Sequence, residues 1–554
     1  MDHRREYALV LLLVGCLGCE SGESTATNDH MVPEVTELAE HVPAPEAPGI
    51  SFPTSCGAAT HARFEKGIFL LHNMMYKQAH AEFAAAAGAD TECAMLHWGI
   101  AMTQFHPQWP GEPTEEALET GAYAVRIARS ITARTTERER GYIEAVGSYY
   151  QDWRNNDRYA RKANWREAQE RHAAAHPEDS EAQIFFLLAQ LTTSDPFDKT
   201  YAQQLEAAEG LEEILEQRPE HPGLLHYLLH AYDNPVYARR GVGVAQRYES
   251  VAPDAPHALH MPSHIYVRLG DWGDVISGNI QSQASALRQP APGGRVSKHF
   301  LHALDYLVYG FLQLADDERA LQEVSKVNAV TEWQLDSGPG AYALSAAPAR
   351  FAIERRAWKE AATLELRAVP YSWDRYPWAE ALTHAARGLG AARSGDIEAA
   401  RASIDELDRF EGLTRDSWWQ RRIRLERDVI SGWIAHEQGR ASAAVQLIGN
   451  AAEEELSAGK LSVEPGHTLY AVEQLGELLL ELDRPREALE AFRRSLADSP
   501  KRFHSLFGAG RAAELAKMDE EATGYYAALT EMVVAGNDRP QVQHASDFLA
   551  KAKQ

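Results

Sequence analysis

The chain has 554 residues, of which 45% are hydrophobic and 24% charged. This composition is ordinary for a globular protein, and the length leaves room for several domains or one elongated array. Because the formal net charge is −25, the surface repels phosphate backbones, and we expect no nucleic-acid partner.

The N-terminus is typical of an export signal. Arg4 and Arg5 precede an apolar run over residues 7–14, which is too short to span a bilayer as a helix. The run ends in Leu-Val-Gly-Cys16, followed by Leu-Gly-Cys19, and this pattern resembles a bacterial lipobox. We therefore predict a lipoprotein signal over residues 1–19 that is lipidated at Cys16 or, alternatively, at Cys19. An ordinary signal peptide with incidental cysteines is the competing interpretation.

The predicted localisation is the bacterial cell envelope, on the periplasmic side or the cell surface. We expect contact with the membrane through the lipid anchor only. Residues 20–55 are rich in Glu, Ser, Thr and Pro, and we expect them to form a disordered tether. Two further cysteines, Cys56 and Cys93, are a candidate disulfide in an exported chain, with two separately buried thiols as the alternative.

From about residue 58 onward, apolar residues recur at helical spacing among Ala, Leu, Glu and Arg, and we predict no sheet. Gly476, Ala488, Phe492 and Pro500 are separated by 12, 4 and 8 residues. This spacing resembles the tetratricopeptide repeat (TPR), in which the glycine lets two helices cross closely and the aromatic ring fills the space toward the next repeat. We predict an all-α, TPR-like α-solenoid of antiparallel helical hairpins that forms a curved superhelix.

Small apolar anchors of this kind recur at intervals of 34 to 45 residues along the second half of the chain. They are Ala238, Val275, Ala320, Ala361, Ala400, Ala444, Ala488 and Ala522. Residues 94–225 have a helical pattern, but we cannot assign repeat anchors at regular intervals within them. We expect an N-terminal TPR-like region over 56–225, His-rich central hairpins over 226–335 and a C-terminal array over 336–554.

Seven of the 23 histidines lie between residues 226 and 302. His257, His260 and His264 are spaced i, i+3 and i+7, on one face of a helix, and His226 and His230 are spaced i, i+4. Imidazoles at such spacing can share one metal ion, and three of them with a carboxylate suit Zn, Cu(II) or non-haem Fe. There are two alternatives: a histidine-lined groove that binds an anionic peptide or a C-terminal carboxylate, and buried histidines that only hydrogen-bond to protein groups.

In TPR proteins the first helix of each hairpin lines the concave groove, with groove-facing residues about 18, 15, 11 and 8 positions before the anchor. Counting back from three anchors selects His230, His257, His260, His264, His302, Asp305 and Tyr309. We predict that the five histidines bind a transition metal and that Asp305 or Tyr309 is a proton-transfer or substrate group. By the same count His226 falls on a packing position, where it would support a ligand. His72 could reach the pocket, although core packing is the competing role.

Three strings carry a closer resemblance: His257-Ala-Leu-His-Met-Pro-Ser-His-Ile-Tyr266, Leu225-His-Tyr-Leu-Leu-His-Ala-Tyr-Asp233, and Phe64-Glu-Lys-Gly67 with Leu71-His-Asn73. They resemble a group of bacterial TPR proteins without an assigned activity. The resemblance implies a helical array and carries over no catalytic residues.

Three functions are consistent with these features. The first is a TPR lipoprotein that binds a peptide, protein or small-molecule ligand in its groove, with a Zn, Cu or Fe ion at the histidines. The second is a metal-dependent enzyme with its active site at the same cluster. The third is a metal-free interaction scaffold. Tyr227 stands where a zinc protease would have the glutamate of His-Glu-x-x-His, so we exclude that class.

Overall fold

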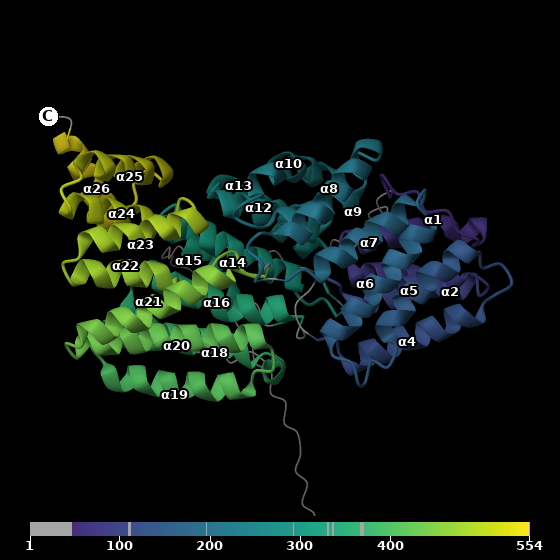
Figure 1. Ribbon diagram of the computed structural model, residues 1–554, viewed down its shortest axis with the longest axis horizontal. Helices are drawn as coiled ribbons and strands as arrows, with labels where there is room; N and C mark the ends of the chain where they lie inside the picture. The colour runs from purple at the N-terminus through teal and green to yellow at the C-terminus, as the bar shows by residue number, and fades with distance from the viewer. Residues whose placement is uncertain are drawn as a thin grey trace, which may run out of the picture. The chain divides into compact units, whose positions relative to one another are not determined.

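The computed structural model of the protein (Figure 1) describes residues 47–552, apart from 109–111, 196, 292, 330–331, 335–336, 366–370 and 462. The predicted lipoprotein signal with Cys16 and Cys19, and the predicted tether up to residue 46, lie outside the described residues. Residues 46–554 form one compact unit, so the three regions predicted within it are parts of one array.

The described residues fold into α-helices joined by short connections. The N-terminal helices are α1 (Ala58–His72), α2 (Tyr76–Ala89), α3 (Ala94–Phe105), α4 (Glu115–Ser130), α5 (Glu137–Tyr150), α6 (Arg158–Ala175), α7 (Ser180–Thr192) and α8 (Ala202–Gln217). The central helices are α9 (Pro222–Tyr232), η1 (Ala238–Gly241), α10 (Val242–Val251), α11 (Pro256–His260), α12 (Pro262–Leu269), α13 (Trp272–Arg288), α14 (Lys298–Gln313) and α15 (Asp317–Ala329).

The C-terminal helices are α16 (Gly338–Glu354), α17 (Trp358–Ala362), η2 (Trp373–Arg375), α18 (Pro377–Arg393), α19 (Ile397–Leu413), α20 (Ser417–Glu437), α21 (Ala441–Ala458), α22 (Ala471–Glu481), α23 (Pro485–Asp498), α24 (Phe503–Leu515), α25 (Asp519–Met532) and α26 (Pro540–Ala552). Across all the described residues, β pairing is limited to two isolated bridges, and none of the helices is long and apolar enough to cross a membrane.

Consecutive helices pack as hairpins along the chain, as α1 with α2, α13 with α14 and α18 with α19 illustrate. The three-residue connections between α1 and α2 and between α18 and α19 make these pairs antiparallel. The predicted all-α, TPR-like α-solenoid is therefore confirmed. The stretch 94–225, which does not phase by sequence, also consists of hairpins, α3 with α4, α5 with α6 and α7 with α8. Its connecting loops differ in length, which shifts the anchors out of register.

The predicted repeat anchors lie at the contacts between helices, since all eight are at most 1% exposed. The glycines of the repeats allow an aromatic ring of the paired helix to approach the backbone closely. A Cβ atom on Gly476 would lie 2.6 Å from the ring of Phe492, and one on Gly67 would lie 2.5 Å from the ring of Phe83. No side chain fits at that separation, so each glycine lets the facing aromatic ring sit directly on the helix backbone.

The predicted tether extends too far into the chain. Residues 47–55 are packed on the first hairpins, and Phe52 is fully buried between the rings of Phe64, Trp98 and Tyr142, with centroids 5.1–5.7 Å away. The backbone is held as well, because Arg138 donates a hydrogen bond of 2.8 Å to the carbonyl of Pro53. A single aromatic residue in a Pro- and Ser-rich segment thus gives it a place in the core, which composition alone does not reveal.

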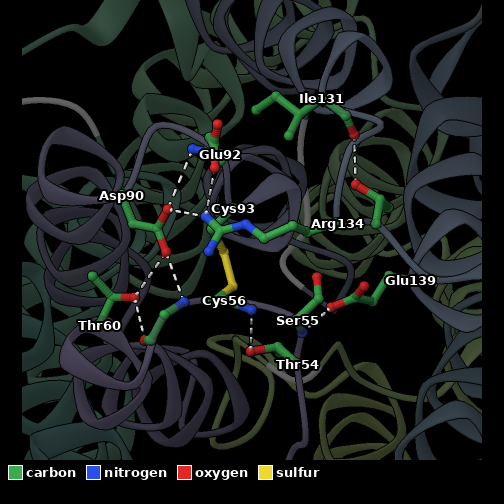
Figure 2. Close-up of a disulfide and its surroundings, with 12 residues drawn as sticks. Thr54, Ser55, Cys56, Thr60, Asp90, Glu92, Cys93, Ile131, Arg134 and Glu139 are labelled. Atoms are coloured by element: carbon green, nitrogen blue, oxygen red, sulfur yellow. Dashed lines mark hydrogen bonds and ion pairs between the residues drawn. A yellow bond between two sulfur atoms is a disulfide. The ribbon is translucent and has the colours of Figure 1, made fainter.

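Cys56 and Cys93 are joined by a disulfide with a Cα–Cα distance of 4.8 Å, which ties the start of α1 to the start of α3. Figure 2 shows the carboxylate of Asp90 beside it. This group accepts a hydrogen bond of 2.7 Å from the backbone N–H of Gly57 and pairs with Arg134 at 2.6 Å. The bond from Gly57 lowers the pKa of Asp90 below its ordinary value, so the carboxylate stays charged.

Candidate metal centre

Three short helices carry five of the clustered histidines. His226 and His230 lie on α9, His257 and His260 on α11, and His264 on α12. The prolines at the starts of α9, α11 and α12 fit the first helical turn, which needs no N–H donor. Between α11 and α12 the helix is interrupted at Pro262, as the sequence indicates.

The first histidine group contains His260, His264 and His302, the last of these from α14. One ring nitrogen from each lies within 4.8 Å of the other two, and all three residues are buried. The Nε2 atoms of His260 and His264 are 3.1 Å apart. Burial lowers the pKa of each of the three imidazoles, which favours their neutral forms.

The other ring nitrogens of this group determine which nitrogen carries the proton. Nδ1 of His260 lies 2.7 Å from Oδ1 of Asn279, whose amide nitrogen donates to the carbonyl of Val275 at 2.7 Å. Nδ1 of His264 lies 3.0 Å from a carboxylate oxygen of Asp233. Because both partners are acceptors, both Nδ1 atoms donate, and each neutral ring presents an Nε2 lone pair to the other.

Asp233 is itself held in a cluster of charges. It accepts a hydrogen bond of 2.8 Å from Arg268 and one of 3.2 Å from Lys460. Burial alone would raise the pKa of Asp233, but Lys460 and Arg268 hold it well below the usual range. Asp233 is therefore a carboxylate that keeps the ring of His264 in one orientation.

The second group contains His226, His230 and His257, again with one ring nitrogen each within 4.8 Å of the others. Nδ1 of His226 donates a hydrogen bond of 2.6 Å to the carbonyl of His72, so its Nε2 carries the lone pair. Burial lowers the pKa of His226 to about 3. Among the described residues, the buried Nε2 atoms of His226 and His230 have no hydrogen-bond partner.

A third group, His72, Glu181 and His221, has the same compact geometry but a different hydrogen-bond state. His221 accepts from the N–H of Leu224 through Nδ1 and donates through Nε2 to Glu181 at 2.9 Å. Nε2 of His72 donates to Glu181 at 3.1 Å, and its Nδ1 accepts from Tyr227 at 2.9 Å. Each ring nitrogen of this group already has a protein partner, which makes it a structural network.

The predicted set of five metal ligands is thus divided between two groups. His260, His264 and His302 form one, whereas His230 and His257 join His226, which sequence phasing places in a supporting position. His72 supports His226 through its backbone carbonyl, while its ring belongs to the structural network.

Asp305 and Tyr309 depart from their predicted roles beside the histidines. The carboxylate of Asp305 pairs with Arg350 at 3.3 Å, and both side chains are fully buried. The hydroxyl of Tyr309 lies 2.9 Å from that of Tyr470 and accepts from Arg502 at 2.8 Å. Both residues serve a buried ion-pair network that joins α14 to the C-terminal helices, which a count along one repeat does not reveal.

The sequence predicts that the histidines line an open groove, but His257, His260, His264 and His302 are buried and His230 is partly buried. The segment that precedes α22 covers these helices. The carbonyl of Glu464 accepts from Tyr306 at 3.3 Å, and the carbonyls of Gly466 and His467 accept from Arg350 at 3.0 and 2.9 Å. Contacts between segments more than 100 residues apart produce this burial, and repeat phasing carries no information about them.

Two pockets border the histidines. One of about 230 Å³ is lined by His230, Asp233, Arg268 and Lys460, among others. Another of about 570 Å³ reaches His299, whose ring centroid is 5.8 Å from that of His257. A small molecule or ion can therefore approach the histidines from solvent through a polar pocket.

Sequence reasoning missed the residues that orient the rings, namely Asp233, Asn279 and Lys460. For Asp233 a signal existed, because it follows His230 by three residues and metal-bound histidines are commonly held by a carboxylate. Asn279 and Lys460 approach from α13 and from the loop after α21, and no spacing within one hairpin points to them.

No protein family and no curated protein sequence matches the chain. Solved structures with a similar arrangement of helices include yeast Tom70, at 10% identity and a TM-score of 0.29, covering 89% of this chain and 96% of that one. They also include monomeric mutants of IFIT1 with Gppp-AAAA and with m7Gppp-AAAA, at 13% and 12% identity and TM-scores of 0.39 and 0.37, each covering 79% of this chain and 90% of that one. At these values the similarities carry no argument about function.

Proposed function

We propose that this chain is a TPR-like lipoprotein of the bacterial cell envelope that binds a transition-metal ion, Zn, Cu or Fe, at His260, His264 and His302. The observation that carries the proposal is the 3.1 Å approach of two Nε2 atoms that each present a lone pair. Two imidazole ligands about 2.0–2.1 Å from one tetrahedral ion have nitrogens about 3.4 Å apart. A cation between the rings turns an unfavourable contact into two coordinate bonds.

A direct hydrogen bond between the rings is the competing explanation. It requires a proton on one Nε2 atom, so either His260 gives up its bond to Asn279 or His264 becomes a doubly protonated imidazolium. A charged His264 would be the third cation around Asp233, which already pairs with Lys460 and Arg268. The charges around Asp233 therefore favour neutral rings, whose two Nε2 lone pairs can bind a cation.

The test is elemental analysis of protein purified without a histidine tag and then exposed to Zn²⁺ after chelation. The wild type is expected to take up tightly bound zinc. The His260→Ala/His264→Ala variant is expected to lose the ion at this group and to keep its helicity by circular dichroism. The proposal fails if the wild type takes up no zinc, or if the double variant binds as much zinc as the wild type.

The export of the chain is a separate part of the proposal and rests on the lipobox-like sequence. Expression in a bacterial host with a labelled fatty acid tests it. The label is expected on the wild type and is lost in Cys16→Ser, whereas Cys19→Ser retains it. Loss of label only in Cys19→Ser would assign the lipidation to Cys19. An unlabelled wild type would contradict the proposed lipid anchor.

A metal-dependent enzyme is the second candidate function. The pocket of about 230 Å³ beside His230 and Asp233 favours it, since three histidine ligands leave a coordination position for water or substrate. This pocket suits a small-molecule ligand better than a peptide. Binding of azide to the Co²⁺- or Cu²⁺-loaded protein, followed by visible absorption, would show an open coordination position. A shell without an open position would argue against catalysis and leave metal binding as the only function.

A further inference from the structure

We infer that the histidine cluster holds two metal ions, the second one at His226, His230 and His257. This inference rests on the proposed function and extends it from one ion to a two-ion centre. The three ring nitrogens of this second group lie within 4.8 Å of one another, which matches the compactness of the first group. Each group offers three nitrogen ligands, enough to hold an ion with one position left for a small ligand.

The hydrogen bonds prepare this group for a cation. The carbonyl of His72 accepts from Nδ1 of His226 at 2.6 Å and so turns the lone pair of Nε2 away from that carbonyl. Metal-bound histidines are typically held in this way by a backbone carbonyl behind the ring. Within the described part of the chain, the buried Nε2 atoms of His226 and His230 lack a hydrogen-bond partner. A metal ion bound between these two nitrogen atoms would satisfy both of them.

Ring packing separates the two ligand sets while keeping them adjacent. The centroid of His226 is 5.0 Å from that of His230 and 5.1 Å from that of His257. Every ring of the six has a neighbour of its own group within 5.1 Å, whereas the rings of different groups, His230 with His264 and His257 with His260, are 6.2 Å apart. The six imidazoles therefore form two neighbouring sets and not one ring of ligands around a single ion.

The group of His72, Glu181 and His221 provides an internal comparison. Its ligand atoms also lie within 4.8 Å of one another. The ring nitrogens of His72 and His221, however, already form hydrogen bonds with Glu181, Tyr227 and the backbone of Leu224. Compactness alone therefore does not identify an ion site. The second group differs from this network in the Nε2 atoms of His226 and His230, which lack a hydrogen-bond partner among the described residues, and we place no ion at the network.

The test is zinc stoichiometry by equilibrium dialysis and elemental analysis on the tag-free chain without its signal. Two ions per chain are expected for the wild type. One is expected for His226→Ala/His230→Ala, one for His260→Ala/His264→Ala and none for the variant with all four changes. His221→Gln is the matched control, because it alters a buried histidine of the saturated network, and it is expected to keep two ions.

The outcomes separate the two claims. One ion in the wild type that survives His226→Ala/His230→Ala overturns the second site and leaves the proposed function standing. A single ion that either double variant abolishes also overturns it, since both sets would then share one ion. No uptake at all removes both claims. Because alanine at two buried positions can unfold the region, the single variant His230→Gln is measured as well, and a folded His230→Gln protein that keeps two fully bound ions contradicts the inference.

Discussion

Nδ1 of His264 donates a hydrogen bond of 3.0 Å to Asp233, and this bond sends the lone pair of the opposite nitrogen toward His260. The orientation of a metal ligand thus depends on a residue that touches no ion. We expect Asp233→Asn to weaken zinc binding about 10- to 100-fold, the usual effect of removing such a partner. Competition with a chelating dye measures the change. Asp271→Asn, which alters an exposed ion pair with Lys501, is the control and should leave the affinity unchanged.

The pair of Asp305 and Arg350 tests the corrected assignment of Asp305. Asp305→Asn leaves the charge of Arg350 buried, and we expect a loss of about 3–5 kcal/mol in the free energy of unfolding. Zinc stoichiometry should not change. Chemical unfolding measures the loss, and the double variant Asp305→Leu/Arg350→Met should recover part of it. A stable Asp305→Asn protein that has lost its metal would restore Asp305 to the metal centre.

Glu426 makes the stability of the C-terminal helices depend on pH. Burial raises the pKa of Glu426 to about 7, although Arg422 donates to one oxygen at 3.2 Å. A carboxyl that is more basic when folded favours folding below its unfolded pKa of about 4.5, and this contribution disappears as the pH rises through about 7.

Glu426→Gln should remove this dependence. At pH 8 the variant is expected to exceed the wild type by up to about 3 kcal/mol in unfolding free energy, and at pH 5 by much less. Arg422 retains Glu455 at 3.3 Å as a partner in the variant. Urea unfolding at the two pH values measures the difference, with exposed Glu437→Gln as control. Equal effects at pH 5 and pH 8 would refute the assignment.

The disulfide between Cys56 and Cys93 should stabilise the N-terminal hairpins. Its sequence separation is 37 residues, and closing a loop of this size typically contributes about 2–4 kcal/mol. We expect Cys56→Ser/Cys93→Ser to unfold at a lower temperature than the oxidised wild type and at about the temperature of the reduced wild type. Peptide mapping without reductant should show the linked pair, and two free thiols in protein isolated from the envelope would contradict it.

The sequence predicts the fold well because the repeat is a local property. Gly476 and Phe492, or Gly67 and Phe83, lie within one hairpin, and the spacing that lets helices cross is visible in the order of residues. Seven of the eight anchors are in regular α-helices, and only Ala238 begins a short 3₁₀ turn. The repeats within residues 94–225 cannot be located in the sequence because the loops between their helices vary in length.

The candidate site is predictable only in part. Helical spacing selects His257, His260 and His264, but it does not show that His260 and His264 face one neighbour while His257 faces His226 and His230. That division falls within α11, between His257 and His260. It arises from contacts with other helices, since the carbonyl of His72 on α1 holds His226 and Asn279 on α13 holds His260. The burial of the site comes from residues 463–470, which lie far along the chain and whose sequence carries no repeat signal.

Anomalous X-ray diffraction from crystals of the zinc-loaded, tag-free protein, measured at the zinc absorption edge, tests the central claim most directly. The account predicts an anomalous peak within bonding distance, about 2.1 Å, of Nε2 of both His260 and His264, with His302 as the third ligand. A map with zinc bound elsewhere and no peak between these two rings would contradict it.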